Sequence, residues 1–207
     1  MKLISQAFLL NYFLLQNELF NYIKIPIILY CIEKNAIKCF KYALINGADL
    51  TQKSVRHLYT INSNIYSDYE HTMEMWDGYG FAGAIGSIQI IKLIEDQGIP
   101  INGDLIKGSS KFHQNHIIHW AEKEYKPLLK DGMKECIQFS NYEVFDMIIQ
   151  NFDVSRLIYP KNKTPLHYAA KYNSKGTFFK LLSEGVNINV IDLLNKKIVI
   201  MLKRKIQ

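Results

Sequence analysis

The sequence predicts an all-α fold, a solenoid of helix-turn-helix units joined by short hairpin or loop connections. Apolar residues recur at the spacing of an amphipathic helix, as in Ile88, Ile91 and Ile94. A pattern of about 33 residues, with small residues, an apolar stretch and a glycine turn, also recurs along the chain. With 207 residues, of which 48% are hydrophobic and 21% charged, the chain can bury a core. Together these observations favour stacked helical repeats.

The clearest copy of the pattern occupies residues 161–193. Its proline suits the first turn of a helix, where the missing N–H costs nothing. Its paired alanines let neighbouring helices approach, and its glycine can end the second helix in a left-handed conformation. The residues that define this copy are Thr164, Pro165, Leu166, His167, Ala169, Ala170, Leu181, Leu182 and Gly185.

Residues 161–193 resemble the ankyrin repeat, with its Thr-Pro-Leu-His-x-Ala-Ala opening and its Leu-Leu-x-x-Gly ending. The resemblance implies a non-catalytic solenoid that binds other proteins on the concave face made by its hairpin fingertips and first helices. It also implies that Thr164 and His167 are structural and hydrogen-bond to each other. Asn35, Ser140 and Asn173 stand where the family has a glycine between the two helices of a unit.

The same template can be placed at three earlier positions, with Cys31-Ile32, Ala82-Gly83 and Cys136-Ile137 at the paired small positions. Two intervals do not fit, and the second is predicted to hold a single helix from Phe112 to Tyr125. The predicted organisation is an N-terminal helical cap or worn repeat at 1–22, an array at 23–193 with units near 23–55, 74–106, 128–160 and 161–193, irregular segments at 56–73 and 107–127, and a basic truncated C-terminal cap at 194–207.

The charge and cysteine content argue for a cytoplasmic protein with one basic end. The net charge is +6, from 25 basic and 19 acidic residues, and the segment 196–205 alone supplies +5 of it. Three cysteines without a close pair do not form a disulfide framework, and a reducing compartment is the simpler interpretation. The basic segment is interpreted as a solubilising cap, with a nucleic-acid or acidic-membrane contact as the alternative.

Three motifs suggest ligand sites but have plainer explanations. Gly78-Tyr79-Gly80-Phe81-Ala82-Gly83 matches G-x-G-x-x-G, yet no apolar strand precedes it. Residues 103–110 resemble a phosphate-binding loop with its lysine misplaced, and are interpreted as a turn between units. His113, His116 and His119 lack a cysteine or an obvious carboxylate to complete a metal site. We therefore expect no metal, no cofactor and no catalytic residue.

The register places candidate binding residues at the fingertips and at the turns within the units. They are Met75, Trp76, Lys130, Asn162 and Lys163 at the fingertips, and Ser87, Asn141 and Ser174 at the turns. Trp76 is the strongest candidate because tryptophan is enriched among binding hot spots. The alternative is that Trp76 packs against the 56–73 segment, near Tyr66 or Tyr69.

The function predicted from the sequence is that of a non-catalytic adaptor or scaffold, monomeric, which binds an unidentified protein. No small-molecule substrate is expected. A contact with nucleic acid or acidic membrane through the basic C-terminal segment is the alternative, and the sequence favours it less.

Overall fold

The computed structural model describes residues 26–51, 53–55 and 75–192, and these residues confirm the predicted all-α fold. The predictions for 1–22, 56–73 and 194–207 concern segments outside the described residues. Within the described ranges, no helix is both long and apolar enough to cross a membrane.

The described helices form five consecutive pairs. The first helices of the pairs are α2 (Ile27–Glu33), α4 (Gly78–Ile85), α6 (Gly103–Lys111), α8 (Met133–Gln138) and α10 (Pro165–Lys171). The second helices are α3 (Ile37–Ile45), α5 (Ile88–Glu95), α7 (Asn115–Glu124), α9 (Tyr142–Asn151) and α11 (Lys175–Ser183).

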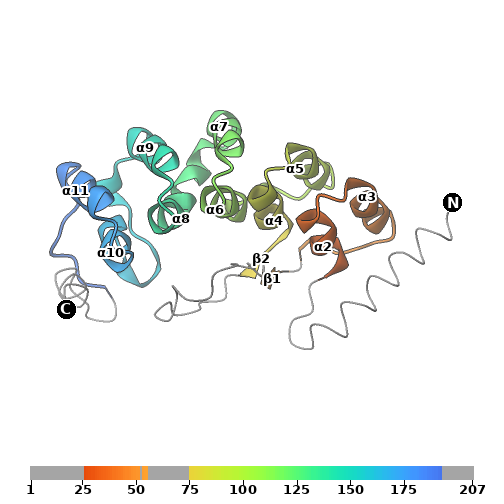
Figure 1. Ribbon diagram of the computed structural model, residues 1–207, viewed down its shortest axis with the longest axis horizontal. Helices are drawn as coiled ribbons and strands as arrows, with labels where there is room; N and C mark the ends of the chain where they lie inside the picture. Colours follow the sequence, from red (N-terminus) through yellow and green to blue (C-terminus); the bar gives the residue numbers. More distant parts are fainter. Residues whose placement is uncertain (1–25, 52, 56–74, 193–207) are drawn as a thin grey trace.

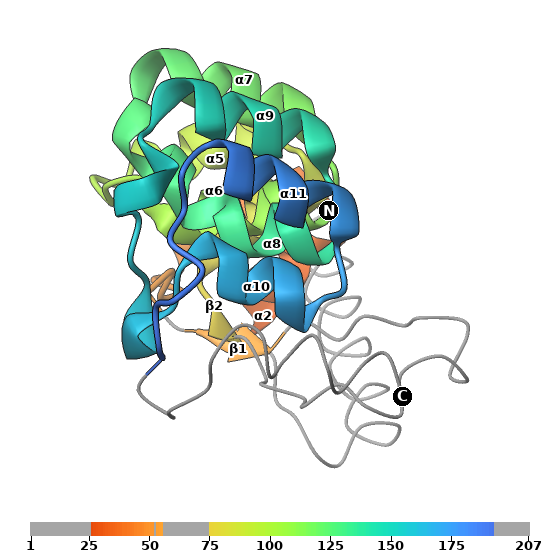
Figure 2. The same ribbon diagram turned by 90° about the vertical axis from the view of Figure 1, so that its left-hand side faces the viewer.

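The pairs follow one another along an arch, with the first helices lining its concave side (Figure 1). Viewed from the end of the arch, the second helices form a separate outer layer (Figure 2). We call the two layers the inner and the outer helices. Two short antiparallel strands, β1 (Ser54–Val55) and β2 (Met75–Trp76), lie on the inner side before α4. The 3₁₀ helices η1 (Lys126–Gly132), η2 (Val154–Arg156) and η3 (Pro160–Asn162) occur in the connections after α7 and α9.

Residues 103–124 form a helix pair, which corrects two predictions. The segment 103–110 is not a turn, because it belongs to α6, and the second helix begins at Asn115, after a turn at His113. Ser109 takes the place of Ala169, since Gln114 N–H donates to its carbonyl at 2.9 Å as Ser174 N–H donates to that of Ala169 at 3.0 Å. Two buried serines at 109–110 therefore occupy the paired small positions.

The turn between the two helices of each pair contains a residue with positive φ. Such backbone favours glycine and tolerates asparagine better than other residues. The five residues are Asn35 (φ 50°), Gly86 (φ 73°), His113 (φ 56°), Ser140 (φ 58°) and Asn173 (φ 55°). The pair formed by α6 and α7 thus repeats the turn of its neighbours with a histidine in place of glycine.

The G-x-G-x-x-G motif lies in α4 and serves helix packing. A Cβ on Gly83 would lie 2.4 Å from the carbonyl oxygen of Leu105, and one on Gly108 would lie 2.2 Å from that of Gly80. Glycine at these positions lets the backbones of α4 and α6 approach each other. Gly80 also leaves room for Trp76, whose Cβ would lie 2.6 Å from an added Cβ.

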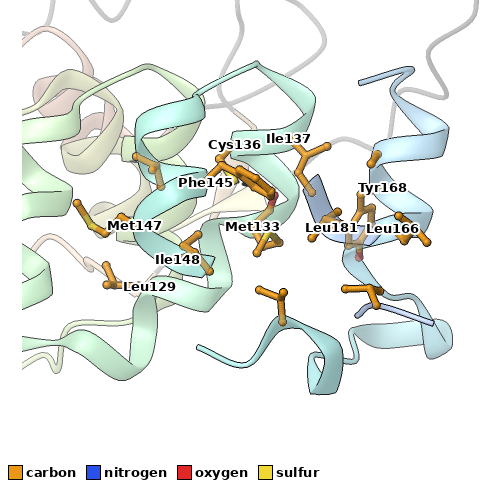
Figure 3. Packing of buried hydrophobic residues seen from close by; sticks show 14 of the residues in the cluster. Leu129, Met133, Cys136, Ile137, Phe145, Met147, Ile148, Leu166, Tyr168 and Leu181 are labelled. Carbon is orange, nitrogen blue, oxygen red and sulfur yellow. Dashed lines mark hydrogen bonds between the residues drawn. The ribbon is translucent and has the colours of Figure 1, made fainter. Parts of the chain in front are cut away.

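The core divides into two hydrophobic clusters that meet at the pair formed by α6 and α7. One extends from α2 to α7, and the other from α6 to α11. Figure 3 shows Met133, Phe145 and Ile148 of the second cluster gathered between α8 and α9. Trp120 packs against both clusters, which makes the stack continuous.

Candidate interaction surface

The N-terminal ends of α4 and α6 are tied together by polar side chains. Asp77 caps α4 by accepting hydrogen bonds from the N–H groups of Tyr79 and Gly80 at 3.0 and 3.2 Å. Its second oxygen accepts from Asn102 Nδ2 at 2.6 Å. Asn102 in turn caps α6 by accepting from Asp104 N–H at 2.9 Å. These caps satisfy helix N–H groups and set two inner helices side by side at the fingertip end.

Asp104 is a buried carboxylate held by two lysines. Its two oxygens accept hydrogen bonds from Lys107 Nζ at 2.9 Å and Lys53 Nζ at 3.1 Å. Burial opposes ionisation of Asp104, but the two lysines outweigh it and hold the pKa of its carboxyl below the usual range. Asp131 lies nearby over Gly103, and burial raises the pKa of its carboxyl despite Lys107 and Lys130.

Three further lysines lie one on each of α6, α8 and α10. Lys111 Nζ lies 5.1 Å from the ring centroid of Trp76 and 5.0 Å from that of Phe139. Lys134 Nζ lies 3.4 Å from an oxygen of the buried Glu135. Lys171 Nζ lies 5.4 Å from the ring centroid of its neighbour, Tyr172. Cation–π contacts of this kind hold an ammonium group in place at a partly exposed site.

Charged residues are distributed differently on the last four inner helices and on the last four outer helices. On α4, α6, α8 and α10 the acidic residues are Asp104 and Glu135, and both are buried, at 7% and 2% exposure. The lysines of these helices all keep partly exposed side chains. The outer helices α5, α7, α9 and α11 instead mix both signs, with exposed acids that include Glu95, Glu143 and Asp146. On these four inner helices the partly exposed charged side chains are lysines, whereas the inner helix α2 carries the partly exposed acid Glu33.

Trp76, the strongest candidate from the sequence, is not a surface residue. It is 3% exposed and makes edge-to-face contacts with Phe81 and Phe112, at centroid distances of 6.5 and 6.0 Å. The expectation of an exposed binding tryptophan is therefore wrong, because the space left by Gly80 lets the ring fold onto α4. Met75, its neighbour in β2, is 54% exposed.

The other candidate residues lie at two separate ends of the inner helices. Lys130, Asn162 and Lys163 lie at the fingertips, where Lys130 is exposed and the other two are partly exposed. Asn162 Nδ2 donates to the carbonyl of Ile191 at 2.7 Å. An eight-residue helix such as α4 is about 12 Å long, so the turn residues at its far end do not join this group.

The turn candidates Ser87, Asn141 and Ser174 stand directly before outer helices. Asn141 is 2% exposed and donates to the carbonyl of Ser110 at 3.0 Å, so the expectation that it contacts a partner is wrong. The hydroxyl of Ser87 accepts from Ile90 N–H at 3.4 Å, and that of Ser174 donates to Thr177 Oγ1 at 2.9 Å. The contact of Ser87 caps α5, and that of Ser174 joins the start of α11 to a side chain of the same helix.

Thr164 and His167 form the buried hydrogen bonds that the ankyrin resemblance implies. Thr164 N–H donates to Nδ1 of His167 at 3.1 Å, and the Thr164 hydroxyl lies 2.9 Å from the same nitrogen. Thr164 is the N-cap of α10, which begins at Pro165. The arrangement orients the start of an inner helix.

The side chains of His113, His116 and His119 contact three different residues of neighbouring helix pairs. Nε2 of His113 lies 3.0 Å from the carbonyl oxygen of Phe139, and Nε2 of His116 lies 3.0 Å from that of Gly86. His119 instead pairs with Glu143 at 2.7 Å. Hydrogen bonds from His119 and Asn115 lower the pKa of the Glu143 carboxyl. Within the described residues, no group of histidine, cysteine or acidic side chains is placed to hold a metal ion.

Sequence reasoning missed the lysines of the inner helices as a group. Lys111, Gln138 and Lys171 are the last residues of α6, α8 and α10. The spacing of these equivalent positions is uneven. Gln138 and Lys171 are 33 residues apart, whereas Lys111 and Gln138 are only 27 apart. A template fixed at 33 residues does not align Lys111 with the other two.

A small cleft lies between the first pairs at the fingertip side. It measures about 230 Å³ and is lined by Leu50, Ile94 and Ile101 on its apolar walls and by Asp77 and Asn102. Binding sites for small organic ligands commonly measure ~300–1,000 Å³. The cleft is smaller than that range.

The ankyrin repeat family model matches residues 161–193. No curated protein matches the chain. Among solved structures, a chain of the complex between a predatory endopeptidase of Bdellovibrio bacteriovorus and an immunity protein is similar to this one, with 12% sequence identity and a TM-score of 0.51. The match covers 88% of this chain and 93% of that chain, and at this identity it shows the likeness of the fold alone.

Proposed function

We propose that this chain, which carries an ankyrin repeat at residues 161–193, is a non-catalytic adaptor that binds a protein partner on the concave face of its inner helices. The observation that carries the proposal is the arch of five helix pairs, which presents one side of five inner helices as a continuous surface. A solenoid buries its helices only against their neighbours along the stack, so this face stays available to a partner.

The contacts described above support a binding role over a chemical one. Thr164 and His167 are engaged in capping, and the three histidines of 113–119 contact neighbouring pairs. Asp104, the buried acid of α6, is held by two lysines. Partly exposed lysines lie on the inner helices α6, α8 and α10.

Two glutamines of the same helix pair offer a matched test. Gln138 ends the inner helix α8 with a partly exposed side chain, and Gln150 is exposed on the outer helix α9. In a nuclease-treated cell extract, we expect the intact chain and Gln150→Trp to retain the same protein, because bulk on the outer layer leaves the inner face open. Gln138→Trp should lose it, because an indole there blocks the concave face.

The contrary results are equally specific. A protein retained undiminished by Gln138→Trp would contradict binding on the concave face. A third variant tests the basic C-terminal segment, with Lys196, Lys197, Lys203, Arg204 and Lys205 replaced by glutamine. Capture lost in that variant alone would assign the contact to residues 194–207. Circular dichroism must show the same helix content in all chains.

A further inference from the structure

We infer that the cleft between the first helix pairs takes a lysine side chain of the protein partner, with its ammonium group on Asp77. The inference rests on the proposed function and specifies one residue that the partner must supply. The walls of the cleft come from the loop after α3, the start of α4 and the loop between α5 and α6. The strand β2, which ends directly before Asp77, lies on the concave side of the arch (Figure 1). The cleft therefore belongs to the face on which the partner is proposed to bind.

The cleft is large enough for one side chain of a partner. Its volume is about 230 Å³, whereas a cavity of ~150 Å³ already holds benzene, which has more heavy atoms than a lysine side chain. Leu50, Ile94, Ile99 and Ile101 form apolar walls that suit the aliphatic stem of a lysine. Thr51 also lines the cleft and is exposed, so the cleft opens to solvent and a partner can enter it.

Asp77 gives the cleft a negative charge that no cation of the described residues balances through an ion pair. It is the charged residue among the described residues that line the cleft, and it is 8% exposed. Its hydrogen-bond donors are three uncharged N–H groups, and Lys53 and Lys107 pair instead with Asp104. The start of a helix contributes only about half a positive charge. Because buried charges are normally paired, a cation is the ligand that complements this cleft.

The hydrogen bonds of Asp77 favour an ammonium over a guanidinium. A carboxylate has about four acceptor positions, two on each oxygen. Oδ1 accepts from the N–H groups of Tyr79 and Gly80, and Oδ2 accepts from Asn102 Nδ2, so one position remains on Oδ2. A guanidinium binds best through two parallel hydrogen bonds to both oxygens, and Oδ1 is already occupied. A lysine needs one position, and its other N–H groups stay hydrated at the open side of the cleft.

An aromatic ring of the partner is the competing occupant. A phenol or an indole fits the volume and would donate one hydrogen bond to Oδ2 of Asp77. Such a ring is neutral, however, and leaves the charge of the carboxylate without a cation. Charges interact more strongly in a partly closed apolar site than in water, so the ammonium is favoured.

The test titrates the full, isotope-labelled chain with n-butylammonium, which reproduces the stem and the ammonium group of lysine. n-Butanol is the matched neutral probe, n-butylguanidinium stands for arginine and p-cresol for tyrosine. Chemical shifts of the backbone amides of Gly78 and Gly80 and of the side-chain amide of Asn102 report binding in the cleft. We expect n-butylammonium to shift these signals and to bind more tightly than the other three probes.

Three variants separate the charge of the cleft from its shape. Asp77→Asn removes the charge and keeps a side chain that caps helices equally well, and Thr51→Trp puts bulk at the edge of the cleft. The control Asp96→Asn removes the same charge from an exposed residue that does not line the cleft. We expect the first two to weaken n-butylammonium binding about tenfold, through loss of a charge-assisted hydrogen bond and through blockage, and the control to weaken it less than about twofold. Circular dichroism must show the same helix content in all chains.

Four results would overturn the inference. They are unchanged cleft signals with n-butylammonium, equal affinity for n-butanol, equal losses in Asp77→Asn and Asp96→Asn, and tighter binding of p-cresol or n-butylguanidinium at the same signals. Because Thr51→Trp keeps the charge and the caps of Asp77, undiminished binding in that variant would also contradict the cleft as the site.

Capture from the cell extract separates this inference from the proposed function. We expect Asp77→Asn and Thr51→Trp to retain less of the protein that Gln138→Trp loses. If both retain it in full while Gln138→Trp loses it, the lysine in the cleft is wrong and the proposed function stands. If Gln138→Trp has no effect on capture, the proposed function is wrong.

Discussion

At the scale of single residues, Trp76 shows how a missing side chain determines the place of another. Gly80 has no Cβ, and the indole of Trp76 occupies that space against α4. Phe81 and Phe112 meet its edges, and the ammonium of Lys111 lies over its ring. A tryptophan expected to anchor a partner therefore joins the fingertip strand β2 to the first core cluster.

Substitution of Trp76 should act on stability and not on a binding surface. Trp76→Ala should lower the free energy of unfolding by about 3–5 kcal/mol, because it leaves a cavity among buried aromatic rings. Met75→Ala, at the exposed neighbouring position, should change it by less than about 0.5 kcal/mol. Urea denaturation followed by circular dichroism measures both. Similar small effects of the two substitutions would contradict the buried position of Trp76.

Asp104 and Asp131 should respond to pH in opposite directions. The pKa of Asp104 is lowered in the fold, so its carboxylate stabilises the fold above the unfolded pKa of about 3.9, and this contribution is lost as the pH falls through the folded pKa. The pKa of Asp131 is raised by burial, so its carboxylate destabilises the fold above the folded pKa, and protonation removes that penalty as the pH falls.

Thermal unfolding of two asparagine variants tests this difference. At pH 7, Asp104→Asn should lower the midpoint and Asp131→Asn should leave it unchanged or raise it. Both differences from the unmodified chain should shrink as the pH falls below about 3.9, where the carboxyls of the unfolded chain become protonated. A midpoint that falls equally in both variants at pH 7 would show that the two carboxylates contribute alike.

At the scale of helices, the packing of α4 on α6 depends on glycine at the contact. The backbones approach so closely that a Cβ on Gly108 would lie 2.2 Å from the carbonyl oxygen of Gly80. Backbone atoms cannot move aside as a flexible side chain can. The pair formed by α6 and α7 is therefore held to its neighbour by backbone contact and by the caps Asp77 and Asn102.

Alanine at two glycines should have opposite effects. Gly108→Ala should lower the free energy of unfolding by about 3 kcal/mol or more, through overpacking against backbone. Gly176→Ala, in α11 with no atom near the added methyl group, should raise it by roughly 0.5–1 kcal/mol through helix propensity. Chemical denaturation of the two variants gives the comparison. Stabilisation by Gly108→Ala would refute the close approach of α4 and α6.

The sequence predicted the helical solenoid well and the second half of the array better than its middle. Residues 161–193 carry the ankyrin signature, and the same template fits 128–160 one period earlier. The pair at 103–124 escaped because Lys111 and Gln138, which end its inner helix and the next one, are 27 and not 33 residues apart, and because Ser109 and Ser110 are polar. The buried hydroxyl of Ser109 is satisfied there by a hydrogen bond that it donates to the carbonyl of Leu105 at 2.8 Å.

The candidate surface was predicted less well than the fold. Trp76 and Asn141 were placed by their register, which gives the position along a unit but not the depth of a side chain. Trp76 is buried through the glycine at position 80, and Asn141 through a hydrogen bond to Ser110 in the preceding pair. Both causes lie in contacts between segments that no local pattern reports.

At the scale of the whole molecule, the two core clusters are joined through one helix pair. Leu105 of α6 belongs to the first cluster and Ile106 to the second, and Trp120 of α7 packs against both. Each pair contacts chiefly its neighbours, so stability spreads along the stack by nearest-neighbour contacts. A weakened middle pair should therefore separate the unfolding of the two ends.

Ile106→Ala should show this separation. We expect a loss of about 2–4 kcal/mol and a broadened urea transition, in which tryptophan fluorescence and helix content no longer change together. The chain has two tryptophans, Trp76 in the first cluster and Trp120 at the junction, so fluorescence follows the first cluster and the junction, whereas helix content follows the whole array. Ile28→Ala, in the terminal helix α2, is the control and should keep the two signals coincident. Coincident, sharp transitions in Ile106→Ala would mean that the clusters unfold as one.

Cysteines at the small positions of the inner helices also allow the local opening of the stack to be measured by their rates of alkylation. Cys31 and Cys136 take the position of Ala169 in their own helices, near opposite ends of the stack, and both thiols are buried. Burial raises the pKa of the Cys31 thiol to about 11 and that of Cys136 well above its ordinary value. Because the thiolate is the reactive form, an alkylating reagent must wait for a local opening at each cysteine. Partly exposed Cys39 should react without that delay and serves as the reference. The slower rates at Cys31 and Cys136 then measure how often the first and the fourth helix pair open in the unaltered protein.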